Sequence, residues 1–238
     1  MYKRFKFGTN RISSNFGFTI VELMIALSIL STILVIGSVI TIQIGGLYTK
    51  GINSANLQNA TRRVVTDITS TLQYSGTVPM PCTPNALTCY ASTNNQSING
   101  QNSDVYSYCV DGTRYTFLLD RKLGKDESNG LVTPHVLWHD KIKTNVCAVL
   151  DMTMANPTDV NSDGDGFEMM PENARLNKFK IVESPVNSGL YMIDLWTAHG
   201  DTDLINVDSN GVARCVGTVG TQFCAISQLS DSALRRVQ

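Results

Sequence analysis

The sequence predicts an α+β fold, in which one long N-terminal helix packs on a globular domain built around an antiparallel β-sheet. Three observations support this prediction. Apolar residues run almost unbroken from residue 18 to residue 44, and an apolar repeat of three and four positions follows over residues 45–76. Residues 77–238 then break into many short strand-like segments separated by turn signals, without an internal repeat. Such a pattern is typical of a helix followed by a sheet domain.

The apolar run is long enough to cross a membrane. Its 27 residues, from Phe18 to Ile44, include a single charged side chain, that of Glu22. A helix of this length measures about 40 Å, against roughly 30 Å for the hydrocarbon core of a bilayer. The apolar core of a secretory signal is shorter, and no Ala-x-Ala cleavage pattern follows this one. We therefore expect a transmembrane helix over residues 18–44.

A basic leader precedes this helix at residues 1–17. It contains four Lys or Arg residues and no acidic residue. The positive-inside rule keeps such a leader in the cytoplasm, so every residue after Ile44 faces outwards. Without the leader, the formal net charge of the chain moves from −1 to −5. The remaining chain has no basic stripe, so no nucleic-acid partner is indicated.

Residues 45–76 continue the helix but become amphipathic. Apolar or small side chains recur at three- and four-residue steps, namely at Leu57, Thr61, Val64, Ile68 and Leu72. One face of this part is therefore expected to pack on a sheet. Gly76 and Pro79 end the helix. Glycine costs a helix about 1 kcal/mol relative to alanine, so Gly37 and the pair Gly45-Gly46 are its expected weak points.

The junction between leader and helix carries the most informative motif of the chain. Gly17 and Phe18 form the junction, Thr19 follows, and Glu22 stands at the fifth position counted from Phe18. An ionised side chain in hydrocarbon costs several kcal/mol, so Glu22 needs a partner there. The pattern resembles the class III signal of type IV prepilins and pseudopilins. This resemblance covers roughly the first 45 residues and extends to the rest of the chain only in general layout.

The resemblance implies cleavage between Gly17 and Phe18 by a prepilin peptidase, followed by N-methylation of Phe18. It also implies that Glu22 pairs with the amino terminus of a neighbouring subunit in an assembled filament. The implied partners are other pilin subunits, the peptidase, an inner-membrane assembly platform, and membrane lipid before assembly. Two features depart from many family members: the leader is long, and the helix lacks the kinking proline of many major pilins.

Six cysteines lie on the predicted outer side of the membrane, at Cys82, Cys89, Cys109, Cys147, Cys215 and Cys224. An even count in an exported domain favours disulfides over free thiols. Six cysteines allow 15 connectivities, and the sequence alone does not choose among them. The short spacings favour Cys82 with Cys89 and Cys215 with Cys224, which leaves Cys109 with Cys147. No C-x-x-C or His-rich spacing indicates zinc.

The exported part begins with a polar stretch, residues 82–104, which we expect to be an exposed loop. A hairpin follows, with strands at 105–110 and 113–119 joined by Asp111-Gly112, a pair suited to a type I′ turn. Further strands are expected at 131–138, 146–150, 177–183, 189–197 and 212–216. Asn210-Gly211 is a second expected tight turn.

One acidic loop is a candidate calcium site. Asp159, Asn161, Asp163 and Asp165 offer oxygen ligands, with Glu168 after them, and no Lys or Arg occurs between Lys143 and Arg175 to neutralise the acids. Oxygen ligands at alternate positions followed by glycine match the start of a calcium loop. Position 12 is Met170 instead of the bidentate Glu of an EF-hand. A solvated polar turn is the alternative interpretation.

No catalytic motif is found in the sequence. His135 and His139 stand four residues apart in a strand-like context, which separates them by about 13 Å. They are therefore poor joint ligands. No nucleophile elbow, phosphate loop, dinucleotide fingerprint or Cys/His catalytic pattern occurs. A structural subunit is expected in place of an enzyme.

We therefore expect a minor pilin or pseudopilin: a single-pass membrane protein that enters an extracellular or periplasmic filament through its N-terminal helix. Type II secretion and DNA-uptake pseudopili are alternative filaments. A membrane-tethered binding domain that never polymerises is the alternative from another class, and a calcium-dependent surface adhesin overlaps the first prediction.

Overall fold

The structure of the protein is a computed structural model, in which the described residues are 17–76, 93–144, 147–185, 188–208, 212–217 and 220–236. The chain divides into two compact units, Met1–Gly45 and Gly46–Gln238. The first unit holds the N-terminal part of a helix, and the second holds the rest of that helix with the β-domain. The predicted α+β class is confirmed.

The long helix α1 extends over Ile20–Tyr74. It runs without interruption through Gly37 and Gly45-Gly46, the expected weak points. Within the first unit every described residue is exposed, and this apolar part of the helix is long enough to cross a membrane. Within the second unit one face is buried, through Leu57, Thr61, Val64, Val65, Ile68 and Leu72. Apolar repeat and buried face therefore coincide, as the sequence predicted.

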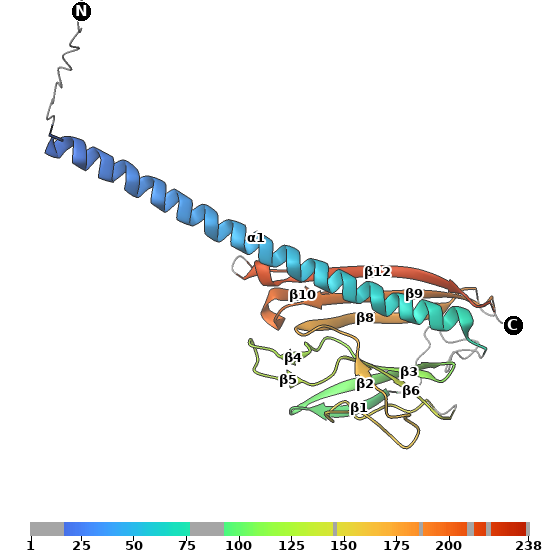
Figure 1. Cartoon of the computed structure of the whole chain (residues 1–238). Helices are drawn as coiled ribbons and strands as arrows, with labels where there is room; N and C mark the ends of the chain where they lie inside the picture. Colours follow the sequence, from blue (N-terminus) through green and yellow to red (C-terminus); the bar gives the residue numbers. More distant parts are fainter. Residues whose placement is uncertain are drawn as a thin grey trace, which may run out of the picture. The chain divides into compact units, whose positions relative to one another are not determined.

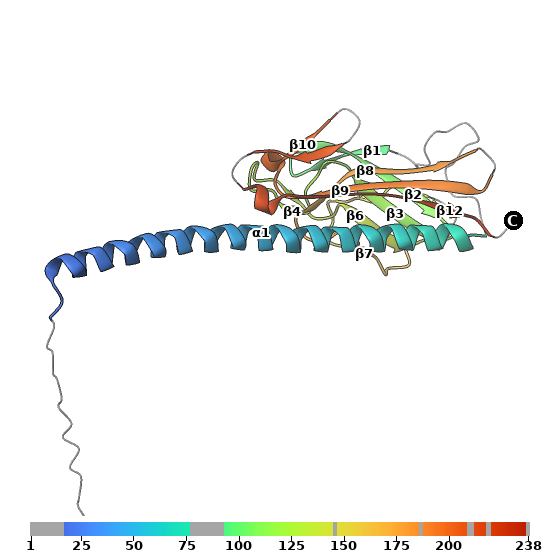
Figure 2. The same ribbon diagram turned by 90° about the horizontal axis from the view of Figure 1, so that it is seen from above.

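A three-stranded antiparallel sheet packs on this buried face, with the strand order β12-β9-β8. Its strands are β8 (Ala174–Glu183), β9 (Leu190–His199) and β12 (Ala225–Leu234). Figure 1 and Figure 2 both show the second part of α1 running along these strands. The hydroxyl oxygens of Thr61 and Thr197 lie 2.7 Å apart where the helix crosses β9. A second bond joins Thr69 to Asp231 of β12.

A five-stranded antiparallel sheet forms the other layer of the β-domain, in the order β1-β2-β3-β6-β7. Its strands are β1 (Thr93–Ile98), β2 (Gln101–Val110), β3 (Thr113–Leu118), β6 (Leu137–Lys141) and β7 (Phe167–Glu168). The main core lies between α1 and the two sheets. Phe117 of β3 and Phe179 of β8 meet there edge to face, with ring centroids 4.7 Å apart.

Four short strands and two 3-10 turns complete the domain. The pair β4 (Gly124–Lys125) and β5 (Val132–Thr133) forms one small hairpin, and β10 (Ile205–Val207) pairs with β11 (Ala213–Cys215). The turns are η1 (Thr202–Leu204) and η2 (Thr221–Phe223). A small separate core, which includes Ile205 and Cys224, supports β10 and β11.

Several expected strands are present. The hairpin at Asp111-Gly112 is confirmed, and both residues have positive φ, 49° and 75°, as a type I′ turn requires. The strands expected at 177–183, 189–197 and 212–216 correspond to β8, β9 and β11. The segment 131–138 is strand only at its two ends, in β5 and the start of β6.

Two expectations are wrong, and one long strand was missed. Residues 93–104 form β1 and the start of β2 instead of an exposed loop, because Asn99-Gly100 makes a tight turn with φ values of 48° and 82°. Residues 147–150 form no strand. Strand β12 was not anticipated, since Ser and Asp residues break its apolar alternation. The rest of the expected loop, residues 82–92, and the Asn210-Gly211 turn lie outside the described residues.

Two disulfides join segments of the β-domain. Cys215 of β11 bonds to Cys224, the pairing that the short spacing favoured, and Cys109 of β2 bonds to Cys147, the pairing that was left. Cys82 and Cys89 lie outside the described residues.

Candidate functional site

The start of α1 is the candidate functional site. Gly17, Phe18 and Thr19 precede the helix without regular secondary structure, and the Phe18 residue is 83% exposed. The Thr19 hydroxyl accepts a hydrogen bond from the backbone N–H of Glu22 at 3.2 Å. The carbonyl of Thr19 accepts another from Leu23. Thr19 is therefore the N-cap of the helix.

Glu22 lies in the first turn of α1, three residues after the cap. The Thr19 hydroxyl donates to the Glu22 carboxylate at 3.5 Å. A threonine followed three residues later by glutamate is the capping-box sequence, and a carboxylate at this end also complements the helix dipole. The sequence analysis missed this local role of Glu22, although the Thr-x-x-Glu pattern signals it. Its carboxylate is exposed and stands one turn from Phe18, where a cation from another molecule can reach it.

The helix surface behind this site is apolar on all sides. Large side chains from Ile20 to Ile44 are exposed all around the helix within the first unit. Monomeric soluble proteins do not expose continuous apolar surfaces of this extent. This part of α1 therefore needs lipid or other helices around it. The chemistry of the site is thus a capped helix end with one carboxylate, followed by a surface that binds only apolar partners.

The candidate calcium ligands of the acidic loop make separate contacts and do not converge on one position. The Asp159 carboxylate pairs with Arg114 at 2.9 Å, so a counter-ion reaches it from outside the loop, although the sequence around the loop offers none. Glu168 turns away and accepts bonds from the amides of Val136, Leu137 and Met170. Asn161 bonds to Thr144 through its side chain, and Asp163 and Asp165 are exposed. In the described part of the chain, no three His, Cys, Asp or Glu side chains gather as metal ligands do.

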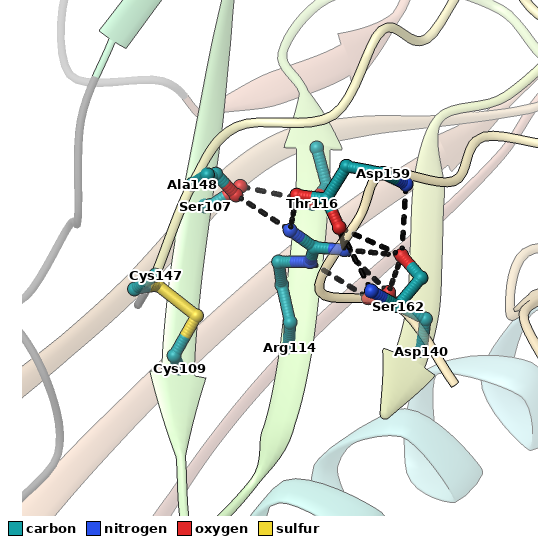
Figure 3. Close-up of a disulfide and its surroundings, with 9 residues drawn as sticks. All are labelled: Ser107, Cys109, Arg114, Thr116, Asp140, Cys147, Ala148, Asp159 and Ser162. Carbon is teal, nitrogen blue, oxygen red and sulfur yellow. Dashed lines mark hydrogen bonds and ion pairs between the residues drawn. A yellow bond between two sulfur atoms is a disulfide. The ribbon is translucent and has the colours of Figure 1, made fainter. Parts of the chain in front are cut away.

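Arg114 is the centre of the buried polar network shown in Figure 3. Its guanidinium is fully buried and donates to Asp140 on the neighbouring strand at 2.9 and 2.5 Å. It also donates to Asp159, to Ser162 and to the carbonyl of Ala148. The Cys109–Cys147 disulfide holds the residue before Ala148. Five N–H donors therefore all have acceptors, and together they fasten the segment 147–162 to the sheet.

Electrostatics of this network follow from burial and charge. Burial alone would raise the pKa of Asp159, but the hydrogen bonds and charge of Arg114 outweigh it and hold that pKa below its usual value. For Arg114, burial lowers the pKa, and the bonds to Asp140 and Asp159 raise it further than burial lowers it. Both shifts favour the charged forms of Arg114 and Asp159. It is a structural centre, since neither acid remains free to act on a substrate.

The histidines do not form a joint site. His135 Nε2 bonds to the carbonyl of Met154, and His139 lies 3.9 Å from the Asp67 carboxylate of α1. His199 Nδ1 bonds to the carbonyl of Phe223. Each ring therefore belongs to a different local contact.

Comparison with known proteins gives one result, at the N-terminus. Residues 12–38 match the family described as the prokaryotic N-terminal methylation motif. This range contains the Gly17–Phe18 junction, Thr19, Glu22 and the first half of the apolar helix surface. Neither the curated proteins nor the solved structures give a match to the chain.

Proposed function

We propose that this chain, which carries the class III signal of the type IV pilin and pseudopilin family, is a minor subunit of a type IV pilus or a related filament. The methylation motif at residues 12–38 supports a pilin-like or pseudopilin-type subunit. Such a subunit is a prepilin peptidase substrate that assembles with other pilins. The observation that carries the proposal is the pairing of this motif with an apolar helix that is exposed on every side.

Assembly would use the two ends of the Phe18–Glu22 segment. Cleavage after Gly17 leaves a new amine on Phe18, which the family methylates. A buried carboxylate is tolerated when a cation pairs with it, so the amine of a neighbouring subunit would neutralise Glu22 when the two helices dock in register. Thr19 holds the Glu22 backbone at the helix start, and this cap leaves the carboxylate exposed for that partner.

The β-domain supports an accessory position in the filament. It devotes residues 142–144 and 147–166 to irregular structure that the Arg114 network and a disulfide fasten to the sheet. Long ordered segments without regular structure are usually functional. A subunit that only had to repeat along a filament would not need one. A type II secretion or DNA-uptake pseudopilus is the alternative filament.

The helix, the methylation motif, the disulfides and the basic leader together support a location of the β-domain outside the cytoplasm. The apolar part of α1 and the methylation motif fit a membrane-anchored pilin. Two disulfides in the β-domain favour an oxidising environment, and the basic leader favours the cytoplasmic side for residues 1–17. We therefore place the β-domain outside the cytoplasmic membrane, before and after assembly.

The test measures processing and incorporation together. N-terminal mass analysis of the mature chain should show a methylated Phe18 as its first residue. Glu22→Ala should be lost from sheared filaments but retained in membranes, whereas Glu127→Ala, which removes an exposed acid of the β-domain, should be incorporated normally. Incorporation of Glu22→Ala at the wild-type level would refute the role of Glu22. A chain confined to membranes would favour the tethered binding domain.

A further inference from the structure

We propose that the free edge of β12 binds an extended segment of another polypeptide as an added strand, and that Asp231 selects a segment that carries a Lys or Arg residue. The proposal goes beyond the proposed function and does not depend on it, because every residue that carries it belongs to the unit Gly46–Gln238. Figure 1 shows β12 as the outermost strand of its sheet, and among the described residues it pairs with β9 alone.

The backbone groups of β12 alternate between β9 and the outer side of the sheet. The Arg235 amide donates to the Gly189 carbonyl at 2.9 Å, and the pairing continues from there along the whole strand without a register shift. In an antiparallel pair every second residue exchanges hydrogen bonds with its neighbour. The odd-numbered residues of β12 therefore bond to β9. The even-numbered residues direct their N–H and C=O groups outward, namely Ile226, Gln228, Ser230, Ser232 and Leu234.

This edge is long, regular and exposed. The strand has 10 residues, with no proline and no register shift. Gln228, Ser230, Asp231 and Ser232 are exposed, and Leu234 is 58% exposed. Natural proteins protect such edges with short strands, prolines, bulges or charged residues, because a row of free backbone groups binds other strands. In β12 the acid Asp231 is the only one of these devices.

Asp231 lies on the α1 side of this edge. One oxygen of its carboxylate accepts a hydrogen bond from the Thr69 hydroxyl at 3.4 Å. The other oxygen accepts from the Ser232 amide at 2.8 Å, which is one of the outward N–H groups. No Lys or Arg in the described part of the chain forms an ion pair with this carboxylate. Asp231 is therefore an exposed charge without a counter-ion, and it occupies one donor of the edge.

A strand that covers the edge buries part of the Asp231 carboxylate. Such burial is costly unless a cation pairs with the charge. Residues opposite each other on neighbouring strands have Cβ atoms about 4.5–5.5 Å apart, so a Lys or Arg across from Asp231 reaches its carboxylate. This cation also draws the carboxylate away from the Ser232 amide, which then bonds to the added strand. Asp231 therefore disfavours neutral and acidic strands and admits a basic one.

The neighbouring side chains define the rest of the partner. On the α1 side, Leu229 packs against the main core and Ala233 is buried, so apolar residues suit the positions on both sides of the basic residue. On the opposite side of the sheet the exposed residues are polar, and the Ser230 hydroxyl donates to Asp194 at 2.6 Å. The partner is thus an extended segment with one polar face and one apolar face, and a basic residue interrupts the apolar face.

The test adds a short synthetic peptide to the full chain in detergent and follows amide hydrogen exchange residue by residue. The peptide alternates threonine with valine and carries lysine in place of its central valine. A second peptide carries glutamate at that place. The readout is the exchange of the outward amides of Gln228 and Ser230. The amides of Leu229 and Ala233 are internal references, because they already bond to β9.

We expect the lysine peptide to slow exchange at Gln228 and Ser230 about tenfold when roughly nine-tenths of the protein holds it, and to leave both references unchanged. The glutamate peptide should have this effect only on Asp231→Lys, in which the charge is reversed. Gln228→Pro lacks one outward N–H group but keeps the bonds to β9. It should therefore unfold at the same midpoint as the control Gln228→Thr and yet lose the lysine peptide.

Equal slowing by both peptides shows an edge that does not select by charge, and no slowing by either shows an edge that binds no strand. Each result overturns the proposal. Slowing of the same amides that rises with protein concentration, in the absence of peptide, assigns the edge to a second copy of the chain and also overturns it. These outcomes leave the proposed function intact, because none of them depends on cleavage after Gly17 or on Glu22.

Discussion

The guanidinium of Arg114 and the carboxylate of Asp159 lie 2.9 Å apart, although 45 residues separate them in the chain. The arginine is fully buried, and its second partner, Asp140, is buried with it. This contact converts a long irregular segment into part of the folded domain. A loop that the sequence presents as a free acidic turn is thus tied to the centre of a sheet.

Removal of the arginine is expected to destabilise the whole β-domain. Arg114→Met leaves the buried Asp140 carboxylate without its cation, and breaking a buried pair in this way costs about 3–5 kcal/mol. Denaturant unfolding of the full chain in detergent measures the loss. Lys125→Met is the control, because the Lys125–Glu127 pair is exposed on both sides, and exposed pairs contribute little. Equal losses for the two variants would contradict a structural role for the network.

The two disulfides are expected to differ in their contribution to stability. Residues Cys109 and Cys147 are separated by 38 positions, and Cys215 and Cys224 by 9. Chain-entropy arguments give about 4 kcal/mol for the longer loop and about 2.5 kcal/mol for the shorter one. Paired Cys→Ser variants of each disulfide, compared by unfolding midpoints, test this order. The reverse order would show that local packing around η2 outweighs loop length.

Acidification is expected to lower the free energy of unfolding of the β-domain through His139. Burial lowers the pKa of His139 below its ordinary 6.5, and the nearby charge of Asp67 only partly opposes this. In the window below 6.5 the unfolded chain therefore binds a proton that the folded protein resists. Stability is complete above 6.5 and falls as the pH drops through 6.5 towards the lowered pKa. Unfolding midpoints at several pH values measure the slope.

His139→Gln is the control for this slope. It removes the titrating group, so the stability of the variant should vary less between pH 7.5 and pH 5 than that of the wild type. Parallel curves for the two proteins would assign the pH dependence to other groups. Because Asp67 also accepts a bond from Tyr115 at 2.8 Å, the helix keeps one contact at this point in the variant.

The sequence predicted those features that depend on neighbouring residues. The helix α1 follows from an apolar run and an apolar repeat, and the β2–β3 hairpin follows from Asp111-Gly112. The strand β1 escaped prediction because its polar composition resembles a loop, although Asn99-Gly100 offered the same turn signal. The strand β12 was not predicted because its apolar alternation is broken at Asp231. Asp231 faces the helix, where an apolar residue would be expected, and bonds there to Thr69.

The candidate site was predicted in part for the same reason. Gly17, Phe18 and Glu22 form a local motif, and the family match covers all three. The partner of Asp159 was not predicted because the sequence around the loop shows only those counter-ions that are close to it along the chain. Arg114 comes close to the loop because β3 pairs with β6. The residues of the loop themselves carry no signal of that pairing. Polar contacts between residues far apart in the sequence can therefore be identified only once the fold is known.

Gly166 is expected to tolerate no side chain. A Cβ at this position would lie 2.6 Å from Cε2 of Trp138, so the indole ring or the acidic loop has to move. Overpacking of this kind costs about 1–3 kcal/mol, and Gly166→Ala should also change the Trp138 emission. Gly51→Ala is the control, since nothing lies within 4 Å of its Cβ position. That variant should gain about 1 kcal/mol, because alanine favours the helix. A neutral Gly166→Ala would show that the loop is not packed on Trp138.

The Thr19 cap allows the two roles of the helix start to be separated. Thr19→Ala removes the acceptor of the Glu22 amide, which should cost about 1 kcal/mol and speed exchange of that amide roughly fivefold. Thr19→Ser keeps the acceptor and should exchange like the wild type. Glu22→Gln also keeps the Thr19 cap, but it removes the charge that a neighbouring amine would neutralise. If the cap served only to form the helix, Thr19→Ala would still enter filaments and Glu22→Gln would not. Loss of both variants from filaments, with unchanged amide exchange in Thr19→Ala, would instead show that the Thr19 hydroxyl takes part in docking.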